Sequence, residues 1–503
     1  MRYDSENSFI KKLDQYDKEL LIGGMVGIER ECIRSIDGKV SQEKHPLSLG
    51  SSLTNNYITT DFSEALIEII TPPYRKKAEL VKFLNDIHHF IFINIEEEDI
   101  WPMSFPPLFL KDTDIKIADY GSSAKGKFKK NYRKGLAERY GRGMQSIAGI
   151  HFNYSYSDEL INLVINEKLL GKEVKTKNQF YLNALRNFQR INWLILYLFG
   201  SSPFVSSNFA ENARHDFSKQ KDIYFLKDAT TLRMSDIGYR LPSQSSFYVS
   251  TRSVEEYIHD LREITEVDKM LKENPNQTNL ELLQIEDEYY TSMRLKSSIQ
   301  TDQRTSAKII NGGVDYLELR SLDIDPFEMN GINKDTIDFI ELCFVYCGMI
   351  SDTPITKDEH TEIQLNDLNV ALQGRKNDLK IVKRNKKIKL YDWANYILND
   401  LDVLASFLSS EIDLGKFREK INFPSKTPSS NFLNAALDHQ NSYSEFASKM
   451  IKENRKHLES FSISENKHWK MLEKEAKESH KKTKKLESQE TSYDQFFLDY
   501  MDS

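Results

Sequence analysis

The chain has 503 residues, of which 39% are hydrophobic and 11% aromatic, and its formal net charge is −7. This length can build one large domain or several ordinary ones, and the apolar content is typical of a folded globular protein rather than a disordered one. The negative charge argues against a general nucleic-acid binder, although local basic patches remain compatible with it.

The cysteines and the apolar runs indicate where the protein works. Cys32, Cys343 and Cys347 are a sparse, odd set, which is typical of a reducing compartment. Cys343 and Cys347 lie four residues apart in an apolar stretch, so we expect core residues on one helical face; a metal pair would need further ligands nearby. The N-terminal sequence lacks the pattern of a signal peptide, and the run WLILYLFG is too short to span a membrane. We expect a cytoplasmic protein with no membrane partner.

Periodicity predicts the following elements in chain order. Residues 5–22 form an amphipathic helix, residues 23–35 a strand, 64–73 a strand, 74–95 a helix, 101–107 a proline-rich loop, 144–157 a strand, 178–203 a buried helix and 314–327 a strand. His88 and His89 fall on the helix 74–95 and are expected to be packing or surface residues.

The mixture of strands and helices lacks a regular β-α-β alternation. It therefore favours an α+β fold with a largely antiparallel sheet. We expect a core over residues 1–375 and a helical, charged C-terminal part over 376–503. Within that part, 466–490 has no strong apolar stripe and is expected to be a solvated helix or linker. The aromatic stretch SYDQFFLDYM that follows is expected to dock on the body.

A lysine-rich region begins with a near match to a phosphate-binding loop. The sequence GSSAKGKF, residues 121–128, has Phe128 where the P-loop needs a hydroxyl, and the stretch before it is too polar for the required buried strand. Residues 125–142 carry eight Lys or Arg against one Glu, with interleaved aromatic residues. That composition suits RNA or DNA contact, and it equally suits a segment that receives phosphates or an anionic substrate. The acidic chain favours the second interpretation.

The stretch GGMVGIERECIRS, residues 23–35, places two acids in an apolar strand. Side chains of a strand alternate between its faces, so Glu29 and Glu31 share one face and Arg30 lies on the other. Two neighbouring carboxylates repel each other unless positive charge lies between them. One interpretation is a solvated edge strand with its charges outward. The other requires partners elsewhere in the chain.

Further acids occur in the other apolar segments. Asp61, Glu64 and Glu68 lie in ITTDFSEALIEII, Glu318 shares a strand face with Arg320, and the strand SIAGIHFNY carries His151. Burying unpaired carboxylates costs several kcal/mol each. Oxygen-ligated divalent cations would compensate that cost, and magnesium is the usual one beside phosphates. His151 is then either a satisfied core residue or a further ligand.

Seven motifs in order resemble those of the bacterial glutamate–cysteine ligases. They are GIERECIR, TTDFSEALIEIITP, WPMSFPP, YRKGLAERYG, MQSIAGIHFNYS, TLRMSDIGY and YLELRSLDIDPF. The resemblance covers roughly residues 20–350 and fades in the helical C-terminal part. It implies a curved, largely antiparallel sheet with flanking helices, related to the catalytic domain of glutamine synthetase.

The resemblance also implies roles for individual residues. The metal ligands would be Glu29, Glu31, Asp61, Glu68, Glu318 and His151, the last near the transferred phosphate. Arg233 and Arg320 would face the acyl phosphate. The wall that receives cysteine would be Phe62, Tyr132, Arg133, Tyr239 and Tyr290, with Tyr289 competing for the role of Tyr290.

The implied activity is ATP-dependent ligation of the γ-carboxylate of L-glutamate to the amine of L-cysteine, through a γ-glutamyl phosphate, in the first step of glutathione biosynthesis. Magnesium or manganese would be the cofactor, ATP the co-substrate, and the enzyme a monomer without a nucleic-acid partner. One alternative is a related carboxylate–amine ligase that uses another amine. Another is a catalytically dead binding protein, against which the intact acids argue; a nucleic-acid contact through residues 125–142 is the third.

Overall fold

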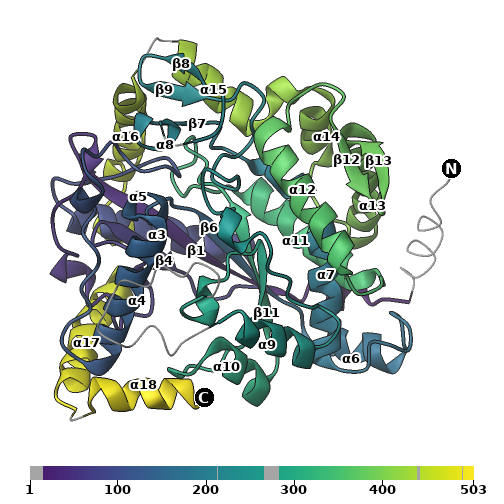
Figure 1. Cartoon of the computed structure of the whole chain (residues 1–503), viewed down its shortest axis with the longest axis horizontal. Coiled ribbons are helices and arrows are strands. Elements are labelled where there is room, and N and C mark those ends of the chain that lie inside the picture. The colour runs from purple at the N-terminus through teal and green to yellow at the C-terminus, as the bar shows by residue number, and fades with distance from the viewer. Residues whose placement is uncertain (1–14, 212, 266–282, 439–441, 490) are drawn as a thin grey trace.

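The computed structural model describes residues 15–211, 213–265, 283–438, 442–489 and 491–503 (Figure 1). Its strands are β1 (Met25–Ile36), β2 (Lys39–Val40), β3 (Ile58–Thr60), β4 (Leu66–Ile70), β5 (Asp99–Ile100), β6 (Ile150–Ser155), β7 (Phe204–Val205), β8 (Ser218–Gln220), β9 (Ile223–Phe225), β10 (Met293–Lys296), β11 (Tyr316–Leu322), β12 (Lys380–Lys383) and β13 (Lys386–Lys389). Helices surround the main sheet on several sides (Figure 1).

The helices differ widely in length, from single turns to 23 residues. They are α2 (Lys18–Leu21), α3 (Lys77–Asn94), α4 (Ala124–Tyr140), α5 (Arg142–Gln145), α6 (Asp158–Asn166), α7 (Lys177–Phe199), α8 (Ser207–Ala210), α9 (Val254–Glu263), α10 (Thr305–Gly312), α11 (Lys334–Met349), α12 (Lys357–Gln373), α13 (Leu390–Leu408), α14 (Leu414–Asn422), α15 (Pro428–Asp438), α16 (Tyr443–Glu459), α17 (Trp469–Glu487) and α18 (Tyr493–Met501).

One large sheet organises the molecule. Its strands run in the order β10-β11-β6-β1-β4-β3, with β2 and β5 also paired to β1, and every pairing is antiparallel. The predicted α+β class with a largely antiparallel sheet is therefore confirmed. The long strand β1 lies between β4 and β6, so residues of β1 face neighbours on both sides.

The back face of this sheet is the apolar one. Ile28 pairs with Phe152, and Phe152 pairs with Leu319, so one apolar row crosses three strands. Phe344 of α11 stacks on Phe152 with a ring-centroid distance of 5.8 Å, and it also contacts Phe188 of α7. These two helices cover the back face and leave the opposite face of the same strands for polar side chains.

The long predicted elements are confirmed with shorter bounds. The helix predicted over 74–95 is α3, and the buried helix predicted over 178–203 is α7, which starts at the N-cap Thr176 and ends before Gly200. The helix predicted over 5–22 lies partly outside the described residues, and its described part is α2. His88 and His89 are both buried, and Cys343 and Cys347 are buried on α11.

The C-terminal part corrects two expectations. It is not wholly helical, because the hairpin β12–β13 precedes α13. Helix α17 is not a solvated linker, because it packs on α3: Leu472 is 2% exposed and Trp469 meets Phe90 with a ring-centroid distance of 5.0 Å. Its buried stripe is completed by Ala476 and Ser479, residues that hydropathy underrates. The expected docking of the final aromatic stretch is confirmed by α18, which packs on α4.

Among the described residues, every helix is either too short or too polar to cross a bilayer.

Candidate active site

The front face of the central sheet gathers the predicted acids in three rows. Glu31 of β1 pairs with Glu68 of β4, and Glu29 of β1 pairs with His151 of β6. In the next row, Asn153 of β6 pairs with Glu318 of β11. Because paired residues on adjacent strands point to the same face, strand register alone brings these side chains together.

His151 lies at the centre of the acid cluster, which we define as Glu29, Glu31, Glu68, Glu318 and His151. Its Nδ1 lies 3.1 Å from Oε2 of Glu29 and 3.8 Å from Oε1 of Glu318, and its Nε2 lies 3.7 Å from Oε1 of Glu31. Ligand atoms of Glu29, Glu68 and His151 all lie within 4.8 Å of one another. Glu31 and Glu318 therefore flank this central group.

The protein satisfies the acids of this cluster unequally. Glu29 accepts hydrogen bonds from Asn153 Nδ2 at 2.8 Å and from His151. Burial alone would raise the pKa of the Glu29 carboxyl, but the His151 bond and nearby cations lower it. Burial raises the pKa of Glu31 and, together with repulsion from the other acids, raises that of Glu68 well above its usual value. The charges of Glu31 and Glu68 thus lack full compensation by the protein.

Glu318, like Glu29, is an acid whose charge the protein compensates. It is 1% exposed and lies 3.4 Å from Lys296 Nζ and 3.3 Å from a terminal nitrogen of Arg320. These cations outweigh burial and hold the pKa of Glu318 well below its usual range. Burial would lower the pKa of Arg320, but Glu318, Glu31 and Glu29 raise it, so the guanidinium stays charged beside the cluster.

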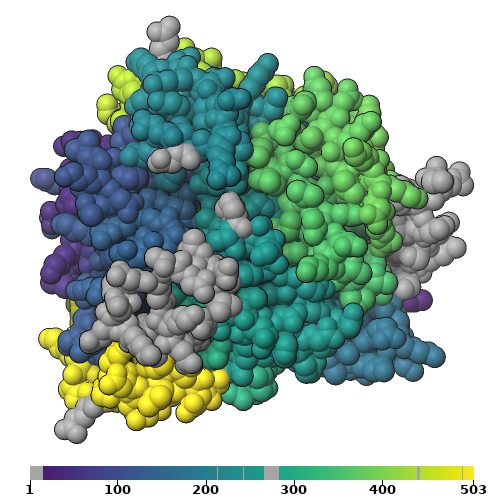
Figure 2. All heavy atoms as spheres, viewed as in Figure 1, coloured from purple at the N-terminus to yellow at the C-terminus, as the bar shows by residue number. Residues whose placement is uncertain are grey.

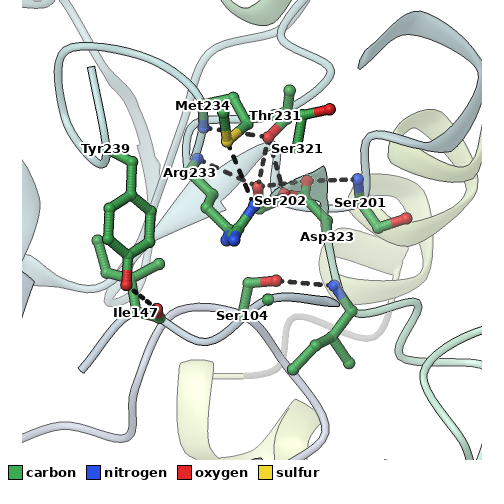
Figure 3. Close-up of polar contacts among 12 residues, drawn as sticks. Ser104, Ile147, Ser201, Ser202, Thr231, Arg233, Met234, Tyr239, Ser321 and Asp323 are labelled. Atoms are coloured by element: carbon green, nitrogen blue, oxygen red, sulfur yellow. Dashed lines mark hydrogen bonds and ion pairs between the residues drawn. The ribbon is translucent and has the colours of Figure 1, made fainter. Parts of the chain in front are cut away.

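Arg233 is held from behind by a buried polar network (Figure 3). Its guanidinium donates two 3.2 Å hydrogen bonds to the carbonyl of Arg320, and its backbone N–H donates to Ser202 Oγ. The carboxylate of Asp323 lies 4.0 Å away and accepts from Ser202 and Thr231 hydroxyls at 2.7 and 2.9 Å. This network places a buried cation between Asp323 and the acid cluster.

The predicted aromatic wall forms one cavity, which we call the Tyr132 cavity. All five predicted wall residues line it, together with Asp61, Glu31, Arg320, Gln145, Leu136 and Asp287. Tyr290 meets the Tyr239 ring with a centroid distance of 5.3 Å, and its hydroxyl accepts a 2.7 Å hydrogen bond from Gln145. Arg133 donates to the carbonyl of Asp61, so the position of this loop acid depends on α4.

A second cavity, the Arg233 cavity, adjoins the first. Its lining includes His151, Arg233 and Tyr289, and Glu31, Tyr239, Tyr290 and Arg320 line both cavities. Tyr290 therefore faces both cavities, whereas Tyr289 lines only the Arg233 cavity. Glu31 of the acid cluster and Arg320 line both cavities, and His151 lines the Arg233 cavity, so two small molecules bound in the cavities would approach each other beside Glu31 and Arg320.

The site also includes residues that the sequence does not predict. Gln145, Lys296 and Asp323 make the polar contacts described above; Gln145 and Asp323 belong to quoted motifs, and Lys296 does not. Asp323 of LELRSLDIDPF gave a usable signal, because it directly follows a β-strand of mostly buried residues and an acid there needs a partner. Lys296 gave none, since its pairing with Glu318 depends on the register of β10 and β11.

The lysine-rich region is not a phosphate-binding loop. Residues 124–140 are helix α4, capped by Ser123, and no described strand leads directly into the loop before it. Phe128 is 7% exposed, packed on α18, while Tyr132 and Arg133 turn toward the Tyr132 cavity. The aromatic residues of this segment thus serve packing and the cavity rather than an open stacking surface.

Known proteins are similar to this chain over most of its length. The family described as Glutamate-cysteine ligase matches residues 10–370. A glutamate–cysteine ligase of Alcanivorax borkumensis is 36% identical over 87% of this chain and 88% of its own length, and one of Shewanella pealeana is 33% identical over 99% of both.

Solved structures give the same result. A crystal structure of a glutamate–cysteine ligase from Francisella tularensis, in complex with AMP, has a TM-score of 0.87 and 33% identity over 95% of this chain and 98% of its own. A bifunctional glutathione synthetase from Pasteurella multocida shares the fold, with a TM-score of 0.71 and 24% identity over 90% of this chain and 55% of its own. By sequence and by structure, this chain belongs to the glutamate–cysteine ligase family.

Proposed function

We propose that the front face of the sheet catalyses ATP-dependent ligation of the γ-carboxylate of L-glutamate to the amine of L-cysteine, giving γ-glutamylcysteine, ADP and phosphate. The observation that carries the proposal is the junction of the two cavities. There, Arg320 lies with Glu31, whose carboxylate is 3.7 Å from His151, and an aromatic cavity opens on one side. Family membership supports the choice of substrates.

The donor set of the acid cluster fits a hard divalent cation. Carboxylate oxygens are the ligands that Mg²⁺ and Mn²⁺ prefer, and the protein leaves the carboxylate forms of Glu31 and Glu68 without full compensation, which raises their pKa. We assign the ligand role to Glu29, Glu31, Glu68, Glu318 and His151, with Asp61 at the edge toward the Tyr132 cavity. Bound there, the cation would neutralise phosphate oxygens of ATP and of the glutamyl phosphate.

The two arginines supply fixed positive charge for phosphoryl transfer. A carboxylate is a poor acyl donor, so ATP first phosphorylates it, and the protein contributes chiefly positioning and charge stabilisation. Arg320 stays charged next to the acids, and Arg233 is fixed by the Arg320 carbonyl and the Asp323 network. Groups that need no reorganisation stabilise a developing charge most effectively.

The Tyr132 cavity is assigned to the amine substrate. Its wall of Phe62, Tyr132, Tyr239 and Tyr290 offers shape and aromatic surface, and Arg133 contributes a charge. Cysteine has a small, weakly polar side chain, so selection in such a cavity depends on size more than on thiol chemistry. L-2-aminobutyrate, in which a methyl group replaces the thiol, is therefore expected to be a usable but poorer substrate.

We extend the proposal to the organisation of the chain and its setting. Residues 1–375 would form the catalytic core and 376–503 a C-terminal part packed on it, as the contacts of α17 with α3 and of α18 with α4 support. The enzyme would act as a cytoplasmic monomer. Sedimentation velocity of the purified protein tests the monomer directly.

The decisive experiment measures ADP release by purified protein with magnesium and glutamate, adding candidate amines one at a time. We expect release with L-cysteine, weaker release with L-2-aminobutyrate, and none without an amine or in excess EDTA. Faster ADP release with another amine would identify that amine, rather than cysteine, as the acceptor substrate. Undiminished activity in EDTA would contradict the cation site.

A further inference from the structure

Helix α18 carries an aromatic face whose function the proposed reaction does not explain. Phe497 and Tyr500 are 5% and 8% exposed, and Phe496 also packs on the same side of the helix. The Phe128 ring of α4 meets Tyr500 with a centroid distance of 4.8 Å and Phe496 with 5.6 Å. Figure 1 shows α18 at the foot of the molecule, beneath α4 and beside α10.

The apolar cluster between α18 and the rest of the protein joins α4 to the segment 283–290, which is distant from it in sequence. Its buried members are Phe128 of α4, Ile285, Phe497 and Tyr500, and the partly buried Tyr132 packs against them. In Figure 2 the yellow C-terminal segment borders both the blue and the teal parts of the surface. One face of α18 therefore contacts α4 and the segment 283–290.

These same two segments both line the Tyr132 cavity. Helix α4 contributes Tyr132, Arg133 and Leu136, while the segment 283–290 contributes Asp287 and Tyr290. Tyr132 lies four residues after Phe128 on the same helical face, and Tyr290 lies five residues after Ile285. No described residue of α18 lines either cavity.

Polar contacts hold the segment 283–290, and one of them is made to α4. Glu286 accepts from Arg304 Nε at 2.8 Å and from the N–H and hydroxyl of Ser306, both at 2.7 Å. Glu288 forms a 2.8 Å ion pair with Arg139 at the end of α4. Further hydrogen bonds hold this segment, from Tyr140 to Glu288 and from Gln145 to Tyr290, and the apolar cluster adds a contact at the Phe128–Tyr132 part of α4.

We propose that α18 is a positioning element for the amine-binding cavity, with Phe497 and Tyr500 setting the spacing of Tyr132 and Tyr290 from outside. The inference rests on the proposed function, because it assigns the Tyr132 cavity to the amine substrate. Without the aromatic face, α4 and the segment 283–290 lose their shared support, and the cavity widens. Glutamate and ATP, placed by Arg233, Arg320 and the acid cluster, do not depend on this spacing.

The test compares Michaelis constants in Phe497→Ala. We expect the KM for cysteine to rise on the order of 10-fold, because small displacements of binding groups carry large costs, with the KM values for glutamate and ATP unchanged. Phe497→Leu, which refills most of the volume, should restore the KM. L-2-aminobutyrate and bulkier amines should be discriminated less sharply by Phe497→Ala than by the wild type.

Two controls separate positioning from stability. Leu498→Ala changes an exposed residue of the same helix, 53% exposed, and should leave all constants unchanged. Phe417→Ala removes a buried ring that packs on Phe339, and should lower the melting temperature without a selective change in the cysteine KM. If Phe497→Ala does not fold, Tyr500→Leu provides the same measurement.

The outcomes are distinguishable. Phe497→Ala could change all three KM values equally, or it could leave the cysteine KM unchanged, as Leu498→Ala should. Either result would overturn the role of α18 and leave the ligase activity standing. A wild-type protein that releases no ADP with glutamate and any amine would overturn the proposed function and this inference with it.

Discussion

The two faces of β1 carry buried charges that the fold treats differently. On the back face, Arg34 is fully buried, pairs with the carboxylate of Glu98, and donates to the carbonyls of Glu43, Lys44 and Glu64 at 3.0, 3.1 and 2.8 Å. On the front face, Glu31 accepts a 2.7 Å hydrogen bond from the N–H of Gly149 and has other acids as neighbours.

The difference separates structural charge from functional charge within a single strand. A buried charge that the protein itself pairs and hydrogen-bonds needs no ligand, and removing its partner destabilises the fold. A buried charge that the protein leaves partly unsatisfied must be stabilised by a ligand, or it destabilises the molecule. The comparison predicts that front-face substitutions affect turnover and back-face substitutions affect stability.

The largest effect is expected for Glu31→Gln. The neutral amide keeps the shape but removes a ligand charge worth several kcal/mol in the transition state, so kcat should fall by at least the order of 10³-fold. The melting temperature in EDTA should stay the same or rise, because repulsion within the cluster is relieved. ADP-release kinetics and calorimetry measure the two effects. A melting temperature that collapses together with activity would show that the acids form a structural network.

The next largest effect concerns the back face. Arg34→Ala leaves Glu98 buried without its cation and should lower the free energy of unfolding by about 3–5 kcal/mol. The kcat per folded molecule should remain normal. Urea unfolding measures the free energy of unfolding. The kcat per folded molecule follows from the rate and from the amount of folded protein, determined without using the active site. The double variant Arg34→Met with Glu98→Leu serves as a control, because removing both charges should restore much of the stability.

Arg320→Ala is expected to lower kcat on the order of 10²–10³-fold, the effect of losing one preorganised electrostatic donor. Arg320→Lys should recover only part of the rate, since a point charge cannot reproduce the planar contact with phosphate oxygens. Kinetics at saturating ATP, glutamate and cysteine measure both variants. A near-normal kcat with reduced thermal stability would instead make Arg320 the partner of Glu318 and nothing more.

The sequence was sufficient for features that depend on short-range periodicity. The alternation in GGMVGIERECIRS placed Glu29 and Glu31 on one face, and the spacing in YLELRS placed Glu318 with Arg320, as the structure has them. Long apolar periodicity located α3 and α7. The resemblance to a known family, rather than any pattern, supplied the roles of the aromatic residues that now line the Tyr132 cavity.

Features that depend on register or on tertiary packing could not be read from the sequence. Lys296 meets Glu318 only because β10 pairs with β11, and Asp323 meets Ser202 and Thr231 across more than 90 residues of chain. The sequence predicts a solvated segment for α17 because Ala476 and Ser479 pack well while contributing little hydropathy. Small buried residues are visible only once the opposing surface is known.

The smallest and most diagnostic effect is expected for Glu68→Gln in metal-free protein. Burial and repulsion from Glu29, Asp61 and Glu31 raise the pKa of the Glu68 carboxyl in the folded state above its unfolded value of about 4.3. A raised pKa means that the stability contributed by this group is fully present below about pH 4.3 and is lost as the pH rises through the folded-state value.

Wild type in EDTA should therefore be less stable at pH 8 than at pH 5. Glu68→Gln should lack this contribution and be more stable than wild type at pH 8. Magnesium should reverse the order, stabilising wild type more than the variant. Urea unfolding at both pH values, with Glu138→Gln as an exposed control, measures the difference. The free energy of unfolding could depend on pH equally in the two proteins, or magnesium could have no effect on it. Either result would mean that the charges of the front face, like those of the back face, are satisfied within the fold.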